Sequence, residues 1–220
     1  INIKKEVKIM DKVKYYVFFG DSITEGIGTT CREAMFSEII AKQTGAKIRN
    51  YGISATRIAN QIKIVEDIDT KSFCQRFDTM DDDADIILIF GGTNDYGHGD
   101  APFGKFSDRT PETFCGALHY LMNGLITKYP SSQIVFLTPL HRENENVPNE
   151  SNSLPLKAYV DKIRETAEYY SLPVLDLYAE GGIYPDNIHQ KELYCPDGLH
   201  PNDAGNEKIA KKIIEFLKTL

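Results

Sequence analysis

Short apolar segments alternate along this chain with longer segments that repeat apolar residues every three to four positions. A short, continuously apolar run is typical of a strand buried on both faces, and the longer repeat is typical of a helix with one buried face. Strands are predicted at residues 15–20, 47–51, 85–90, 133–138 and 173–177. Helices are predicted at residues 32–43, 55–68, 110–128 and 156–170, with a last helix capped by Asn202 or Asp203.

Strands that alternate with helices in this way are typical of a parallel sheet covered by helices. The chain has 220 residues, of which 41% are hydrophobic and 26% charged, as in ordinary globular domains. It contains no internal repeat, low-complexity tract or linker that would divide it. We therefore predict one domain over residues 1–220, with residues 1–12 as a candidate N-terminal extension.

Composition narrows the classes of partner. A net charge of −7 argues against nucleic-acid binding, which usually needs a basic face. No segment approaches the roughly 20 apolar residues of a membrane span. The four cysteines form no CxxC pair, which gives no signal for a zinc site. A chain of this length does not need disulfides for stability, which favours free thiols in a reducing compartment. A cytoplasmic location is expected, with a secreted form that has lost a signal peptide as the alternative. The oligomeric state has no signal in the sequence.

Chemically useful residues follow the predicted strands at their carboxyl ends. Ser22 follows the first strand, Gly52 the second and Asn94 the third, and Asp197 and His200 share a loop before the last helix. The carboxyl ends of parallel strands lie at one edge of a sheet, where ligands bind. A serine hydroxyl becomes a good nucleophile when an imidazole removes its proton and a carboxylate orients that imidazole. These residues therefore predict a site for nucleophilic catalysis.

Four sequence segments carry a specific resemblance to a known family. Gly20-Asp21-Ser22-Ile23-Thr24, Gly52, Gly92-Thr93-Asn94-Asp95 and Asp197-Gly198-Leu199-His200-Pro201 resemble, in order, the sequence blocks of the SGNH hydrolases, also called the GDSL esterase/lipase family. Ile23 departs from the leucine of the name-giving motif, which is a near-isosteric apolar exchange. The resemblance implies a flavodoxin-like three-layer α/β/α sandwich with a central, mostly parallel five-stranded sheet.

The resemblance also implies roles for individual residues. It assigns Ser22 as the nucleophile, His200 as the base and Asp197 as the carboxylate that orients the base. It assigns the oxyanion hole to the backbone N–H groups of Ser22 and Gly52 and to the side-chain amide of Asn94. The block around Gly52 is short, and Gly45 is its competitor, although Gly45 precedes the strand rather than following it.

The expected function is that of a serine esterase that forms an acyl-serine intermediate on a small-molecule ester and needs no metal or organic cofactor. The loops near the predicted site are polar and contain scattered tyrosines, which favours a short acyl group such as acetyl on a sugar or another polar alcohol. Tyr96 and His98 are the candidate substrate-binding residues. Lysophospholipid or thioester cleavage is the alternative within the same family.

Two further hypotheses belong to other classes of protein. Residues 22–26 also resemble, more distantly, the hydroxyl-rich phosphate loop of flavodoxins, which would make the chain an FMN-binding module. That reading leaves Asn94 and the Asp197–His200 pair without a purpose. A catalytically silent sugar-binding relative is the other hypothesis, and the presence of every catalytic residue type argues against it.

Overall fold

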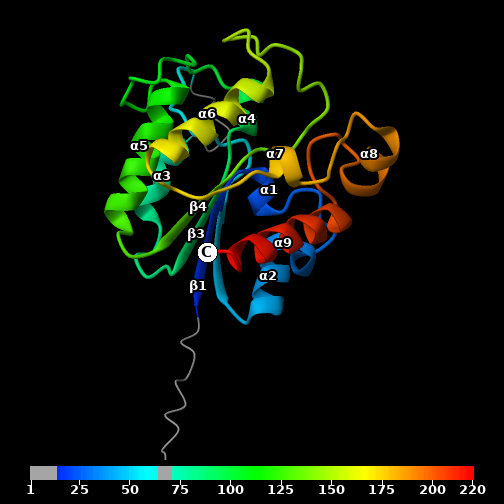
Figure 1. Cartoon of the computed structure of the whole chain (residues 1–220). Coiled ribbons are helices and arrows are strands. Elements are labelled where there is room, and N and C mark those ends of the chain that lie inside the picture. Colours follow the sequence, from blue (N-terminus) through cyan, green and yellow to red (C-terminus); the bar gives the residue numbers. More distant parts are fainter. Residues whose placement is uncertain (1–13, 64–70) are drawn as a thin grey trace, which may run out of the picture.

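A computed structural model of the chain describes residues 14–63 and 71–220 (Figure 1). The predicted N-terminal extension, residues 1–12, lies outside the described residues. The central sheet contains β1 (Tyr15–Gly20), β2 (Lys47–Gly52), β3 (Ile86–Phe90), β4 (Gln133–Leu137) and β5 (Val174–Leu175). The helices of the described residues are α1 (Ser22–Glu25), α2 (Phe36–Thr44), α3 (Phe73–Arg76), α4 (Thr93–His98), α5 (Phe114–Lys128), α6 (Leu156–Tyr169), α7 (Leu177–Glu180), α8 (Ile188–Tyr194) and α9 (Asp203–Leu217), with 3-10 turns at Arg32–Ala34 and Phe77–Thr79.

The five strands are all parallel and lie in the order β2-β1-β3-β4-β5, which confirms the predicted three-layer α/β/α architecture. Their last residues are partners in the strand register. Gly20 of β1 pairs with both Gly52 and Phe90, and Leu137 of β4 pairs with Phe90 and Leu175. The carboxyl ends of the strands thus form one row across the sheet, and the loops that leave this row start at the same level.

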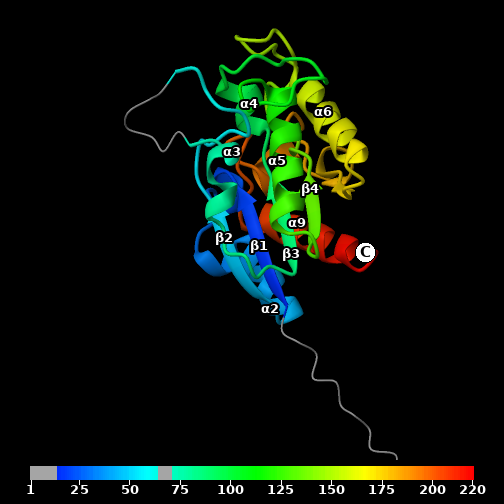
Figure 2. The same ribbon diagram turned by 90° about the vertical axis from the view of Figure 1, so that its left-hand side faces the viewer.

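Helices cover both faces of the sheet, so side chains that alternate along a strand enter different cores. From β1, Phe18 packs into a core shared with α2 and α9, whereas Phe19 packs into a core shared with α3, α5 and α6. Figure 1 shows α5 and α9 on opposite sides of the strands, and in Figure 2, turned by 90°, α5 lies in front and α9 behind. This two-sided burial explains why β1, β3 and β4 are mostly apolar rather than alternating, whereas β2, at the edge of the sheet, contains polar residues and is partly exposed.

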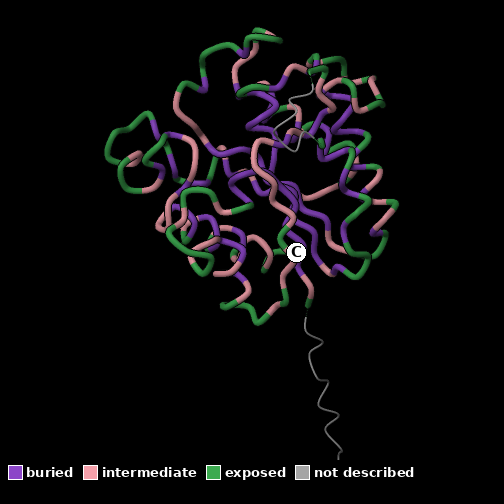
Figure 3. Tube along the Cα trace, turned by 180° about the vertical axis from the view of Figure 1, so that it is seen from behind, coloured by how far each residue is buried: buried purple, intermediate pink, exposed green. Residues whose placement is uncertain are grey.

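The strands β1, β3 and β4 are almost entirely buried at the centre of the described chain (Figure 3). Every residue of β3 is buried. The start of this strand is held to β1 by polar groups, because Asp85 Oδ2 accepts the backbone N–H of Tyr15 at 2.7 Å and the Asp85 N–H donates to the Tyr15 carbonyl at 2.9 Å. A carboxylate and a backbone pair therefore fix where β3 begins beside β1.

The helix predicted at residues 55–68 is wrong over the described residues 55–63, which form turns and irregular backbone. The backbone N–H groups of Ile58 and Ala59 donate to the Asp95 carboxylate, at 2.8 and 3.0 Å, instead of to carbonyls within a helix. Ala55 also has a φ of 62°, which is incompatible with a right-handed helix. Residues 64–68 of the predicted helix lie outside the described residues.

Smaller corrections concern the segments after the strands. The residues after Ser22 and Asn94 form the short helices α1 and α4 rather than loops, and α8 lies in a segment where no helix was expected. The helix predicted from residue 110 begins at Phe114, because Thr113 supplies the cap and accepts the N–H of Gly116 at 3.1 Å. Local hydrogen bonds of this kind decide where a helix starts.

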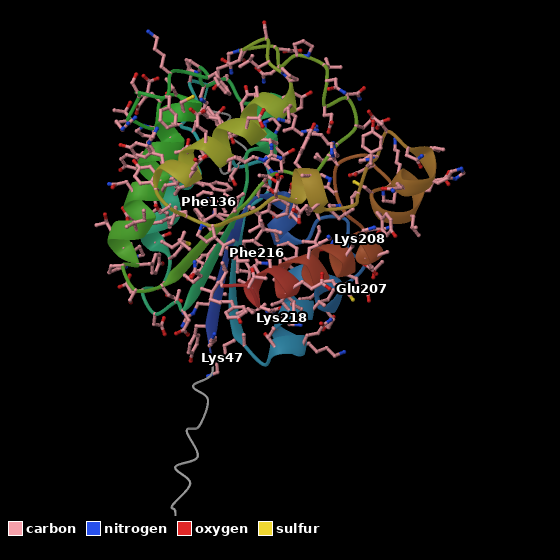
Figure 4. All side chains as sticks on the ribbon, viewed as in Figure 1. Lys47, Phe136, Glu207, Lys208, Phe216 and Lys218 are labelled. Atoms are coloured by element: carbon pink, nitrogen blue, oxygen red, sulfur yellow. The ribbon has the colours of Figure 1, made fainter. Side chains whose placement is uncertain are left out.

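The final helix begins where the sequence predicts, with Asn202 as its N-cap. Side chains on α9 also hold α8 in place. Lys208, labelled in Figure 4, lies with its Nζ 4.2 Å from the centre of the Tyr194 ring at the end of α8. The four cysteines are free, as predicted; Cys31 is exposed and the other three are buried. Among the described residues, no helix has the length and apolar character needed to cross a bilayer.

Candidate active site

Ser22 occupies the first position of α1, two residues beyond the end of β1. Asp21 caps this helix, because its Oδ1 accepts the backbone N–H of Ile23 at 3.0 Å. The Ser22 side chain lies within hydrogen-bond distance of an imidazole from the other end of the chain, with 3.0 Å between Ser22 Oγ and His200 Nε2. Strand, turn and cap together thus present the hydroxyl at the carboxyl edge of the sheet.

The other nitrogen of the His200 ring contacts a carboxylate. His200 Nδ1 lies 2.7 Å from Asp197 Oδ2, and Asp197 Oδ1 accepts the backbone N–H groups of Leu199 and His200 at 2.8 and 2.7 Å. Burial acts to raise the pKa of Asp197, but the hydrogen bonds from His200 and Leu199 outweigh it and lower the pKa. Asp197 is therefore ionised near neutral pH and can hold an imidazolium at Ser22.

Asn94 lies in the first turn of α4, which begins after Gly92 in the left-handed conformation (φ 103°). Its side chain is held at both ends: Nδ2 donates to the Thr56 carbonyl at 3.1 Å, and Oδ1 lies 3.1 Å from His98 Nε2. Desolvation together with the charge of Arg57 and Arg142 lowers the pKa of His98 to about 4. The ring is then neutral at pH 7, and a proton on Nε2 would donate to Asn94. One N–H of the Asn94 amide has no partner in the described chain.

Gly52 is placed differently from the prediction that its N–H faces a substrate. That N–H donates to Asn50 Oδ1 at 2.8 Å. A Cβ at Gly52 would lie 2.2 Å from the backbone nitrogen of Glu25, so the glycine lets β2 pack directly against α1. The structure thus gives Gly52 a packing reason, and its amide would have to leave Asn50 before it could serve an oxyanion. Gly45, the competitor, caps α2 far from this edge.

The two predicted substrate-binding residues, Tyr96 and His98, both line a pocket of about 600 Å³ beside α4. The Tyr96 side chain is buried, and its hydroxyl oxygen lies 2.7 Å from the carbonyl oxygens of Asn144 and Val147. Tyr96 therefore anchors the segment 141–153, whereas His98 contacts the candidate oxyanion donor Asn94. Of these two residues, His98 is the one that lines the pocket and also contacts Asn94.

Sequence reasoning missed three groups that the fold brings to this region. Arg57 and Arg142 line the same pocket. Glu145, buried in the segment 141–153, lies 2.8 Å from His141 Nδ1 and accepts the Tyr178 hydroxyl at 2.9 Å. Arg57 and Arg142 each lie five residues beyond the last residue of a strand, β2 and β4, which was the one signal available in the sequence.

Two further carboxyl groups lie buried near Ser22. Burial raises the pKa of Asp21 from 3.8 to about 7, against the hydrogen bond from the Ile23 N–H. Burial likewise raises the pKa of Asp95 to about 6, against the hydrogen bonds from Ala59 and Ile58. The folded state therefore binds protons at these carboxyls more tightly than the unfolded state does. Their stabilising contribution is greatest below pH 4 and is lost progressively as the pH rises from there to about 6 for Asp95 and about 7 for Asp21.

We expect Asp21→Asn to remove part of this pH dependence while keeping a side-chain oxygen for the Ile23 N–H. Relative to the variant, the wild-type free energy of unfolding should fall between pH 4 and 7 by at most about 1.4 kcal/mol per pH unit. Urea unfolding at a series of pH values measures this difference, with the exposed Asp186→Asn as control. Parallel stability curves for the wild type and Asp21→Asn would contradict the assignment.

The residues proposed as a flavin phosphate loop do not form an open, hydroxyl-lined loop. Ser22 contacts His200, and Thr24 is 1% exposed within α1. A hydroxyl that contacts His200 and a hydroxyl that is buried are poorly placed to bind a phosphate group. The geometry of this segment therefore favours the nucleophile interpretation over the FMN-binding one.

Comparison with known proteins gives a consistent picture. A model of the GDSL-like lipase/acylhydrolase family matches residues 18–208. A solved structure of a protein from Lactobacillus plantarum is 30% identical, with 94% of this chain and 98% of that chain covered and a TM-score of 0.81. A lipase/acylhydrolase from Enterococcus faecalis is 19% identical, with 94% and 96% covered and a TM-score of 0.66. No curated protein sequence matches the chain.

A further solved structure, of a two-domain esterase active on acetylated mannans, is 19% identical. The alignment covers 94% of this chain and 49% of that chain, with a TM-score of 0.62. At such identities, the likeness to the last two structures concerns the fold.

Proposed function

The chain belongs to the GDSL-like lipase/acylhydrolase family of hydrolases, and from this premise we propose that it is a serine esterase acting through an acyl-serine intermediate. The observation that supports the proposal most is the continuous contact from Ser22 Oγ through the His200 ring to Asp197, over distances of 3.0 and 2.7 Å. An imidazole in this position can remove the serine proton while the carboxylate holds it in the required tautomer.

In the proposed reaction, Ser22 Oγ attacks the ester carbonyl as His200 Nε2 takes the hydroxyl proton. His200 then gives this proton to the leaving alcohol, and the acyl group stays on Ser22. A water molecule repeats the sequence, with His200 as its base, and releases the acid. Asp197 remains ionised throughout and stabilises the imidazolium form of His200.

The tetrahedral intermediate needs donors for its oxyanion. We propose the Ser22 backbone N–H and the free N–H of the Asn94 amide as two of them. Asn94 suits this role because its contacts with Thr56 and His98 fix which end of the amide is the nitrogen. One such donor typically contributes about 3 kcal/mol to the transition state. Gly52 remains a proposed third donor, on condition that its N–H leaves Asn50.

His98 is proposed as a positioning residue that acts through Asn94. We expect His98→Ala to lower kcat about tenfold with little change in KM, because the Asn94 amide would lose the contact that orients it. His98→Gln should restore much of the rate, since its amide can donate to Asn94 Oδ1. Steady-state kinetics on a 4-nitrophenyl ester measures both, with the exposed His189→Ala as control. An effect on KM alone, or no rescue by glutamine, would contradict the positioning role.

For the substrate, we propose a short acyl group, such as acetyl, on a sugar or similar polar alcohol. The pocket beside α4 is lined mainly by polar and charged side chains, which suits a polar substrate better than a fatty chain. The similar fold of an esterase active on acetylated mannans is compatible with this choice. A chain-length series of 4-nitrophenyl esters tests it, with lysophospholipids and thioesters in the same panel. Preference for eight or more carbons would overturn the proposal.

A further inference from the structure

Two arginine side chains approach α4 from its opposite ends. Arg142 Nη1 lies 3.2 Å from the Thr93 carbonyl oxygen at the start of the helix, and Arg57 Nη2 lies 3.3 Å from the His98 carbonyl oxygen at its end. Gly97 makes room between them, because a Cβ there would lie 2.6 Å from Arg142 Nη1. Both guanidinium groups line the 600 Å³ pocket. Positive charge therefore borders the helix that holds Asn94.

Neither guanidinium forms an ion pair with a carboxylate among the described residues. Each also has a buried Nε without a hydrogen-bond partner in that part of the chain. Partly buried arginines are usually paired with an acid, because an uncompensated charge is costly to desolvate. Such a pair of arginines beside a reactive serine can bind a negatively charged ligand.

The acidic side chains of the pocket are largely engaged elsewhere. Asp100 accepts the backbone N–H groups of Ile62 and Lys63, both at 2.8 Å. Glu143 forms an ion pair with Lys191 at 2.8 Å. Glu150 is exposed. At His98, which lines the pocket, the charges that act on the ring are those of Arg57 and Arg142, and they disfavour its protonated form. At the His98 ring the nearby charges are therefore positive, although Arg57 also interacts with Asp95 and Asp100, and Arg142 with Asp21 and Asp197.

We propose that the substrate of this enzyme bears an anionic group, such as a carboxylate, sulfate or phosphate, that binds between Arg57 and Arg142. This inference rests on the proposed esterase function and specifies its substrate class. A guanidinium binds oxyanions through two parallel hydrogen bonds, which fixes orientation as well as adding affinity. Arg142 contacts Thr93, the residue before Asn94, and Arg57 follows Thr56, whose carbonyl accepts the Asn94 amide, so an anion held there would lie beside the proposed oxyanion donor.

The competing explanation is that both arginines only hold α4 in place through their contacts with Thr93 and His98. A purely structural role would affect neutral and anionic esters to the same extent. A binding role would affect the anionic ester selectively. The ratio of the two rates, rather than either rate alone, therefore decides between the explanations.

Two matched pairs of esters measure that ratio. Mono-4-nitrophenyl glutarate and 4-nitrophenyl valerate place the charge, or its absence, on the acyl side. The anion and the methyl ester of 4-acetoxybenzoic acid do the same on the alcohol side. Each kcat/KM is divided by the hydroxide-catalysed rate of the same ester to remove intrinsic reactivity. We expect the anionic member of at least one pair to be preferred about tenfold or more, and the pair that responds identifies the charged side.

Arg57→Gln and Arg142→Gln should each reduce that preference several-fold while the neutral ester changes less. Arg109→Gln, on the loop before α5, is the matched control and should leave the preference intact. Equal rates for both members of both pairs in the wild type would overturn the proposal. So would variants that lose activity on neutral and anionic esters equally.

A binding measurement keeps the inference separate from the esterase proposal. The Ser22→Ala variant is titrated calorimetrically with the anion of 4-acetoxybenzoic acid and with its methyl ester. Saturable binding of the anion that is weakened by Arg142→Gln supports the anion site even if no ester is cleaved. Equal binding of the two ligands, or no binding of the anion, contradicts it. If the wild type cleaves none of the esters but the anion still binds, the esterase proposal alone is contradicted.

Discussion

Replacing Ser22 with alanine is expected to lower kcat on 4-nitrophenyl acetate by about 10⁴-fold or more, because the Ser22 hydroxyl is the one that contacts the proposed base His200. The fold should be unaffected. Ser22 Oγ makes its one described contact with His200, and the alanine methyl group fits where the serine Cβ lies. The measurement is steady-state hydrolysis at several pH values, with circular dichroism and thermal unfolding as checks on the fold.

The exposed Ser131 offers a matched control, since Ser131→Ala removes a hydroxyl at the opposite edge of the sheet. It should leave kcat within twofold of the wild type, a change that corresponds to less than about 0.5 kcal/mol. A fluorophosphonate should label the wild type at Ser22 and leave Ser22→Ala unlabelled. Wild-type turnover by Ser22→Ala, or a label on another residue, would exclude the proposed mechanism.

Asp197→Asn is expected to lower kcat by about 10³- to 10⁴-fold while the backbone of its turn is preserved. The asparagine oxygen can still accept the N–H groups of Leu199 and His200, but the side chain near His200 Nδ1 loses its negative charge. The imidazole is then free to adopt the tautomer that places a proton on Nε2, facing Ser22. The imidazolium formed during the reaction also loses its counter-charge.

Kinetics at saturating ester measure this effect, and Asp203→Asn is the control. Asp203 belongs to the same part of the chain and accepts hydrogen bonds from Thr30 N and Oγ1 at 2.8 and 2.6 Å, so its loss perturbs the surface without reaching His200. A drop of less than tenfold in Asp197→Asn would show that another group orients His200. Similar losses in both variants would indicate general disturbance of the loop.

The strands β1, β3 and β4 were predictable because burial on both faces leaves an apolar run, and the alternation with helices indicates parallel strands. The segment 55–63 was not predictable in the same way. Ile58 and Ile62 have helical spacing, yet Ile58 enters the core and Ile62 is 70% exposed. The decisive group is Asp95, which binds the N–H groups of Ile58 and Ala59 and lies 36 or 37 positions further along the chain. Sequence periodicity has no access to such a distant hydrogen bond.

The residues of the site also divide into those that the sequence could place and those that it could not. Ser22, Asn94, Asp197 and His200 could be placed together because each follows a recognisable strand or precedes a helix, and the structure brings Ser22, His200 and Asp197 into contact. The hydrogen bond from Gly52 to Asn50 could not be foreseen, since an amide that is free in one loop conformation is occupied in another. The approach of Arg57 and Arg142 to α4 depends on how two separate loops fold over the sheet.

The hydrogen bonds between Asp85 and Tyr15 at the start of β3 have a consequence for how this chain could misfold. β3 is apolar at every position. Shifting it by one residue would replace one apolar side chain by another on each face, and the buried apolar area would change little. Hydrophobicity alone does not choose its alignment. The alignment is fixed by Asp85 at the start of the strand and by Asp95 after its end, which accept hydrogen bonds from backbone N–H groups of neighbouring segments. A slip would move Asn94 by about 3.3 Å, enough to misplace a donor while the protein still looks folded.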